Sequence, residues 1–159
     1  MKKKAFNKGK GSDLKLINYA ITGDPSETDA NQDDYPSELI HLIQRMHNRV
    51  TQKKPNIIQE LKDVIAKHPN VPAFKNYLML AYSNAGEAKK ALGYAHQIYK
   101  EHPNYLYARV NLANTYIQDG VLDRVPELLG EGMELGLLYP HRKVFHVSEV
   151  TNYYKSAIW

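Results

Sequence analysis

A tripeptide that recurs at a fixed distance limits most strongly what this 159-residue chain can fold into. His68-Pro69-Asn70 returns 34 residues later as His102-Pro103-Asn104. The same offset relates Leu78 to Leu112, Tyr82 to Tyr116, and Gly86 to Gly120. Identities at one period across a turn, a helix and a second turn indicate an internal repeat, in which each copy builds the same structural unit.

Helical spacing of the apolar residues begins at Pro36 and continues to the end of the chain. Pro72 precedes an expected helix, where a missing amide hydrogen costs least. Gly86 and Gly120 stand where the first helix of each copy should end, a place that often requires a left-handed residue. Small residues such as Ala91 let a second helix approach the first closely. The pattern therefore predicts an all-α domain of helical hairpins over residues 36–159.

The repeated residues resemble the tetratricopeptide repeat, a 34-residue helix-turn-helix family with Leu, Tyr, Gly, Ala and Pro at set positions. The best matching unit is 72–105. Its matches to the family's seventh, eleventh, fifteenth, twentieth and thirty-second positions are Leu78, Tyr82, Gly86, Ala91 and Pro103. The resemblance implies a right-handed superhelix of about three such hairpins, and it covers roughly residues 38–159.

The units on either side match less well. The unit 106–140 keeps Leu112, Tyr116 and Gly120, has Val125 in place of the alanine, and reaches Pro140 about three residues late. The unit 38–71 keeps Pro69 but has Gln44 and Asn48 where Leu and Tyr are expected. After the last unit, apolar residues on one helical face predict a capping helix over about 143–158.

The first 35 residues have a different composition. Five lysines between Lys2 and Lys10 precede any acidic residue, and Asp24 to Asp34 is acidic. We expect a largely flexible tail, with a marginal short helix over 13–22 that Asp13 would cap. Residues 11–159 have 16 basic and 17 acidic side chains, so the pI of about 9.1 reflects the lysines of the first ten residues. Nucleic-acid binding is therefore disfavoured, because only this tail would support it.

Several functional classes lack their residues. With no cysteine, disulfides, thiolate metal sites and cysteine nucleophiles are excluded. The histidine pairs His41 with His47 and His141 with His146 lack the spacing that places two imidazoles on one helical face. Phosphate-binding, nucleophile-elbow and dinucleotide motifs are also missing. We therefore predict no enzyme activity, no metal site and no cofactor. No run approaches the ~20 apolar residues of a membrane span, and no apolar run follows the charged start, so a cytoplasmic location is expected.

The resemblance also implies where a partner would bind, because the first helices of this family line a concave groove. The implied partner-binding residues are Arg49, Asn76, Leu80, Ser83, Asn84, Tyr107, Val110, Asn114 and Gln118. Further groove positions carried over are Leu39, Leu42, Met46, Val50, Ala73 and Ile117. Asparagine amides both donate and accept, so Asn76 and Asn114 could pair with a peptide backbone.

One branch of the family binds carboxylate tails of chaperones through lysine and asparagine at fixed groove positions. The matching positions here are Leu42, Met46, Tyr107 and Asn111, and they include no cation. That partner is disfavoured. The sequence predicts a protein-protein interaction module, an adaptor or scaffold, that binds a peptide or helix of a partner in the groove. The alternative is a structural or self-association segment of a larger helical-repeat assembly, forming a homo-oligomer through the C-terminal helix.

Overall fold

The computed structural model describes residues 17–24 and 34–158, which are mostly helical. The expected lysine-rich tail and most of the acidic stretch lie outside the described residues. The main helices are α1 (Ser37–Thr51), α2 (Ile57–Lys67), α3 (Pro72–Asn84), α4 (Ala88–Glu101), α5 (Leu106–Gln118) and α8 (Val147–Ala157). In the part of the chain that is described, no helix is long and apolar enough to cross a membrane.

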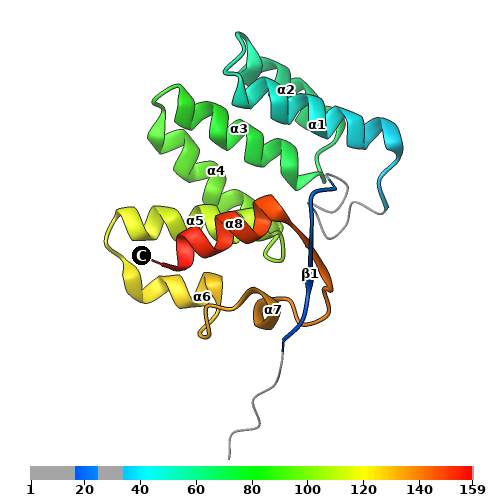
Figure 1. The fold of residues 1–159 in the computed structure, drawn as a ribbon. Coiled ribbons are helices and arrows are strands. Elements are labelled where there is room, and N and C mark those ends of the chain that lie inside the picture. The colour runs from blue at the N-terminus through cyan, green and yellow to red at the C-terminus, as the bar shows by residue number, and fades with distance from the viewer. Residues whose placement is uncertain (1–16, 25–33, 159) are drawn as a thin grey trace, which may run out of the picture.

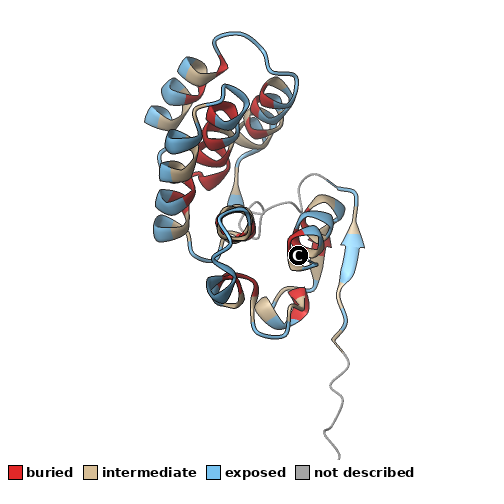
Figure 2. Ribbon diagram, turned by 90° about the vertical axis from the view of Figure 1, so that its left-hand side faces the viewer, coloured by how far each residue is buried: buried red, intermediate tan, exposed pale blue. Residues whose placement is uncertain are grey.

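Each main helix packs on its neighbours in the chain. Helix α3 contacts α1, α2 and α4, and α5 contacts α4 and α8 (Figure 1). The buried residues form one apolar cluster around α1 to α3 and another from α4 onward, and they face the seams between helices (Figure 2). Ala91 and Tyr94 on α4 pack against both clusters. Consecutive hairpins therefore share apolar seams, because no single hairpin could bury its apolar face alone.

Glycines end the first helices of both well-matched units, as predicted. Gly86 follows α3 with a φ of 77°, and Gly120 follows α5 with a φ of 73°. One residue further on, the amide of Glu87 donates to the Tyr82 carbonyl at 2.9 Å, and that of Val121 donates to the Tyr116 carbonyl at 2.8 Å. This backbone bond across five residues is typical of a helix end closed by a left-handed glycine.

The second helix of the unit 106–140 is not continuous. In its place are the 3-10 turn η3 (Leu122–Arg124) and two short helices, α6 (Val125–Leu129) and α7 (Leu135–Leu138). Gly130, at φ 85° and ψ 147°, ends α6, and Met133 has a positive φ of 45°. Neither backbone conformation is helical, so a third regular hairpin, as the repeat spacing predicts, does not form.

The expected short helix over 13–22 is wrong for the residues that can be described. Ala20–Thr22 form strand β1, which pairs in parallel with β2 (Val144–His146), while 13–16 lie outside the described residues. The Tyr19 ring meets Phe145 edge-on at 5.0 Å between ring centroids, and the hydroxyls of Tyr19 and Tyr154 lie 3.0 Å apart. These contacts with distant residues override the weak local preference for a helix.

The C-terminal helix α8 begins four residues later than predicted, because 144–146 form β2. It packs along α5 (Figure 1), and it buries Tyr153, whose hydroxyl donates to the carbonyl of Leu129. Tyr153 is therefore used within the chain, whereas Val147 and Ile158 are exposed. Self-association through this helix stays a prediction.

Gly136 offers a test of the link between the N-terminal strand and the C-terminal part. A Cβ atom at this position would lie 2.2 Å from Cγ2 of Ile17 and 3.3 Å from the Tyr19 ring. We expect Gly136→Ala to destabilise the protein by about 1 to 3 kcal/mol through overpacking and to displace β1. Hydrogen exchange at the amide of Ala20, which donates to the Lys143 carbonyl at 2.8 Å, should accelerate at least about tenfold.

Gly93→Ala is the matched control. Gly93 lies inside α4, and a Cβ atom there would meet nothing within 4 Å. This variant should stabilise the protein by about 0.5 to 1 kcal/mol, because alanine favours a helix over glycine. Unchanged exchange at Ala20 in Gly136→Ala would contradict the described packing of β1.

Candidate functional site

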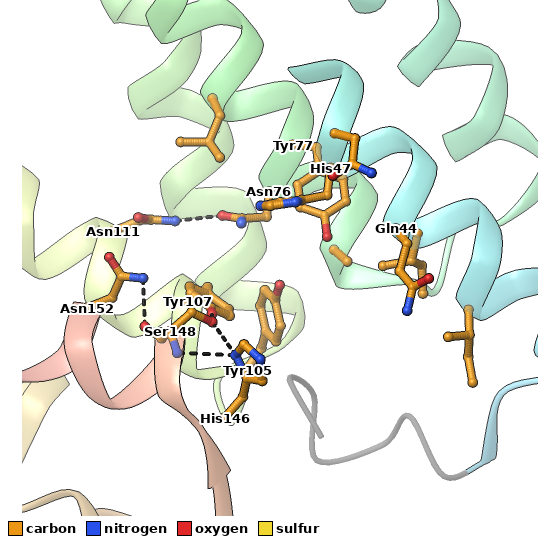
Figure 3. A pocket seen from close by; sticks show the side chains of 15 residues that line it. Gln44, His47, Asn76, Tyr77, Tyr105, Tyr107, Asn111, His146, Ser148 and Asn152 are labelled. Atoms are coloured by element: carbon orange, nitrogen blue, oxygen red, sulfur yellow. Dashed lines mark hydrogen bonds between the residues drawn. The ribbon is translucent and has the colours of Figure 1, made fainter. Parts of the chain in front are cut away.

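A cavity of about 530 Å³ opens between α1, α3, the start of α5, and the β2 to α8 junction (Figure 3). We call it the groove. Every one of these elements contributes side chains that converge on it. Its lining residues are Ile40, Ile43, Gln44, His47, Asn48, Ala73, Asn76, Tyr77, Leu80, Tyr105, Tyr107, Asn111, His146, Ser148 and Asn152.

The α1 wall uses residues one position away from those implied by the repeat register. Ile40, Ile43 and His47 line the groove, whereas Leu39, Leu42 and Met46 had been expected there. Successive residues of a helix differ in direction by about 100°, so a shift of one residue changes which face is presented. The helical register implied for the unit 38–71 is therefore corrected. This unit has Gln44 and Asn48 at the positions where the repeat has Leu and Tyr, so its sequence does not mark the register.

Two consequences of this rotation concern predicted residues. Met46 and Val50 are buried in the core between α1 and its neighbours. The Nε of Arg49 donates to Oε2 of Glu60 on α2 at 2.7 Å, so its side chain joins α1 to α2. Arg49 therefore faces α2 and does not line the groove.

The wall between α3 and α5 is fixed by a pair of amides. Asn76 is only 4% exposed, and its Oδ1 accepts a hydrogen bond from Nδ2 of Asn111 at 2.6 Å. In Figure 3 this bond crosses from α3 to α5 along the cavity. Because the bond uses the oxygen of Asn76, the Nδ2 group of that residue can still donate to a ligand.

The end wall is a hydrogen-bonded chain at the start of α8. The Tyr107 hydroxyl lies 2.7 Å from Oγ of Ser148, and that Oγ lies 2.7 Å from Nδ1 of His146. The backbone amide of Ser148 donates to the same Nδ1 at 3.1 Å. Nδ1 therefore acts as an acceptor, and the neutral ring has its hydrogen on Nε2. His146 serves as the N-cap of α8 while it lines the groove.

A buried ion pair outside the groove fixes the same junction between β2 and α8. Glu149 is 1% exposed, and Arg142 donates to its two carboxylate oxygens at 2.9 and 2.6 Å. The amide of His146 also donates to Glu149 at 2.9 Å, which completes a capping box. Bidentate arginine pairs have a fixed geometry. The position of the end wall is thus set by groups that do not line the groove.

Aromatic rings form two further parts of the lining. The rings of His47 and Tyr77 lie 5.6 Å apart between centroids, and those of Tyr105 and Tyr107 lie 5.7 Å apart. Burial, above all, raises the pKa of the Tyr107 hydroxyl to about 12. Tyr107 is therefore neutral near pH 7. It can donate or accept a hydrogen bond, but it does not add charge.

The structure brings together only some of the residues predicted for partner binding. Asn76, Leu80 and Tyr107 line the groove, as does Ala73. Val110 is 2% exposed and belongs to the core, so its assignment is corrected. The others lie further along α3 and α5 and do not line the groove: Ser83, Asn84, Asn114, Ile117 and Gln118.

Other groove residues were missed by the sequence analysis. Asn111 was considered only as a clamp residue, and its contact with Asn76 links positions that are 35 residues apart, one more than the repeat. His146 ends β2, and Ser148 and Asn152 lie on α8, both outside the three repeat units. A signal was present in Glu149, which stands three residues after His146, as the glutamate of a capping box stands three residues after the N-cap.

Across residues 17–24 and 34–158, no group of three or more His, Asp or Glu side chains could hold a metal ion. The groove instead offers amides, hydroxyls, and aromatic and imidazole rings beside apolar side chains. Such a surface can exchange hydrogen bonds with a polar backbone and bury apolar side chains next to it.

The raised pKa of Tyr107 predicts how stability depends on alkaline pH. A tyrosine titrates near 10 when exposed to water, and the folded state keeps Tyr107 protonated up to about 12. The resulting stability is complete below pH 10 and is lost as the pH rises toward 12. We expect Tyr107→Phe to reduce the loss of unfolding free energy between pH 9 and pH 11 by about 1 kcal/mol.

Urea unfolding at the two pH values measures this difference. Tyr139→Phe is the companion variant, because burial also raises the pKa of Tyr139 to about 12 although its hydroxyl bonds the carbonyl of Asn104 and not the groove. Both variants should lose less unfolding free energy than the wild type between pH 9 and pH 11. An equal loss in wild type and Tyr107→Phe would contradict the described burial of this hydroxyl.

Comparisons of this chain with protein-family models, with curated proteins and with solved structures found no match. The function is therefore inferred from the geometry and chemistry of the groove and from the internal repeat.

Proposed function

We propose that this chain is a tetratricopeptide-type helical repeat protein that binds a polypeptide segment of a partner in the groove. The repeat supports the proposal because equivalent residues have equivalent surroundings in the two well-matched units. Leu78 and Leu112 are both nearly fully buried, and Gly86 and Gly120 end α3 and α5 in the same conformation. A residue pattern that recurs together with its packing favours a shared repeat architecture.

The groove itself is the observation that carries the functional proposal. It is concave, it has a volume of about 530 Å³, and the first helices of three successive units contribute to it. Its amides come from four elements: Gln44 and Asn48 on α1, Asn76 on α3, Asn111 on α5, and Asn152 on α8. Spacing along several elements suits a chain-like ligand better than a compact one.

Each kind of lining residue has a role in this proposal. Amide groups can pair with both the N-H and the C=O of an extended backbone. Tyr77, Tyr105 and Tyr107 present large rings with polar ends, which are common anchors at interfaces. Ile40 and Leu80 provide apolar surface for side chains of the segment. Binding energy would come from these anchors, and the amides would set the direction of the chain.

Leu80 gives a direct test, because it lines the groove and is 37% exposed, so that it can be replaced without opening the core. Twelve-residue peptides selected from a random displayed library on the wild-type chain would be remade synthetically and titrated by fluorescence anisotropy. We expect Leu80→Arg to weaken their binding at least about tenfold, because the arginine fills the groove and charges it.

Leu137→Arg is the matched control. Leu137 lies on α7, is 54% exposed, and does not line the groove. It should leave affinity unchanged, and both variants should keep the helical circular dichroism of the wild type. Equal affinities for all three proteins would contradict binding in the groove.

A further inference from the structure

We infer that the groove selects a polypeptide segment in which the residues that enter the groove include no Asp, Glu, Lys or Arg. This inference rests on the proposed function and names the chemical class of the bound segment. Among the described residues, the lining contains none of these four side chains, although they make up 24% of the whole sequence. Apart from His47 and His146, the polar groups of the lining are amides and hydroxyls.

Two basic side chains that stand next to lining residues in the chain are held by acidic partners outside the groove. Lys75, next to Asn76 on α3, is buried and bonds Glu101 of α4. This lysine, followed by the amide of Gln97, lowers the pKa of the Glu101 carboxyl. Arg49, close to Asn48 on α1, bonds Glu60 of α2. Neither cation is therefore offered to a ligand in the groove.

The end wall follows the same arrangement. Arg142 and Glu149 flank His146 in sequence, and they bond each other through both carboxylate oxygens. Glu149 also accepts from the His146 amide. A carboxylate or ammonium entering the groove would lose water and find no Asp, Glu, Lys or Arg side chain in the lining as a counter-ion. Burying an ion without a counter-ion is much less favourable than burying a neutral polar group.

Neutral polar groups of a bound segment, by contrast, can find hydrogen-bond partners in the groove. The amides of Asn76 and Asn111 and the hydroxyls of Tyr107 and Ser148 can satisfy a backbone or a side-chain amide.

Charged derivatives of a selected peptide test the inference. A peptide whose binding is weakened by Leu80→Arg would be synthesised with an acetylated N-terminus and an amidated C-terminus. Each central neutral residue would then be replaced in turn by Lys or by Glu. At the peptide position in closest contact with the groove, we expect either charged residue to weaken binding at least about tenfold. Titrations at pH 8 keep histidines in general mostly uncharged.

A compensating charge in the protein makes the test sharper. Gln44 lines the groove on α1 and is half-buried. Gln44→Glu should recover at least about fivefold of the affinity lost by a Lys derivative, and should weaken the Glu derivative further. Gln118→Glu makes the same change of net charge on exposed helix α5 surface outside the groove. It should change neither affinity.

The outcomes separate this inference from the proposed function. Peptides that depend on Leu80 and lose affinity when a Lys or Glu is inserted support both. Peptides that depend on Leu80 but require a charged anchor residue overturn the neutral selection and leave the groove as a binding site. A library that gives no peptide sensitive to Leu80→Arg contradicts the proposed function, and the inference fails with it.

Discussion

The burial of α3 among its neighbouring helices is the constraint on which the rest of the structure depends. Nine of the 13 residues of α3 are buried, and this helix contacts α1, α2 and α4. Because α3 packs on neighbours on several sides, only a narrow face of this helix borders the groove. Asn76 and Leu80 reach the groove from that face. The cavity thus results from how successive hairpins share their apolar seams.

The repeat made the central part of the fold predictable. Leu78, Tyr82 and Gly86 define the packing face and the end of one helix, and their counterparts 34 residues later do the same for the next. Helices α3, α4 and α5 therefore lie where the sequence predicts them. Four of the groove residues, Ala73, Asn76, Leu80 and Tyr107, were also accessible by this reasoning, because they belong to the helices whose register the repeat sets.

Features that depend on contacts between distant residues could not be predicted in this way. The register of α1 is set by its packing, since Gln44 and Asn48 do not mark it as Leu and Tyr would. Strand β1 exists through its partner β2, which lies more than 120 residues away. The end wall of the groove likewise needs the Arg142 and Glu149 pair, which fixes the start of α8. The local preference of a segment for helix or strand does not reveal contacts with residues far away in the chain.

The amides of Asn76 and Asn111 lie at the centre of the proposed site, so their side-chain NMR signals test the account most directly. During a titration of the ¹⁵N-labelled chain with a capped, uncharged peptide selected as described, both signals should move and saturate with a single dissociation constant. The side-chain amide of Asn56, exposed between α1 and α2 outside the groove, should not move. Saturable shifts at Asn56 or elsewhere, with Asn76 and Asn111 unchanged, would place binding outside the groove and contradict the account.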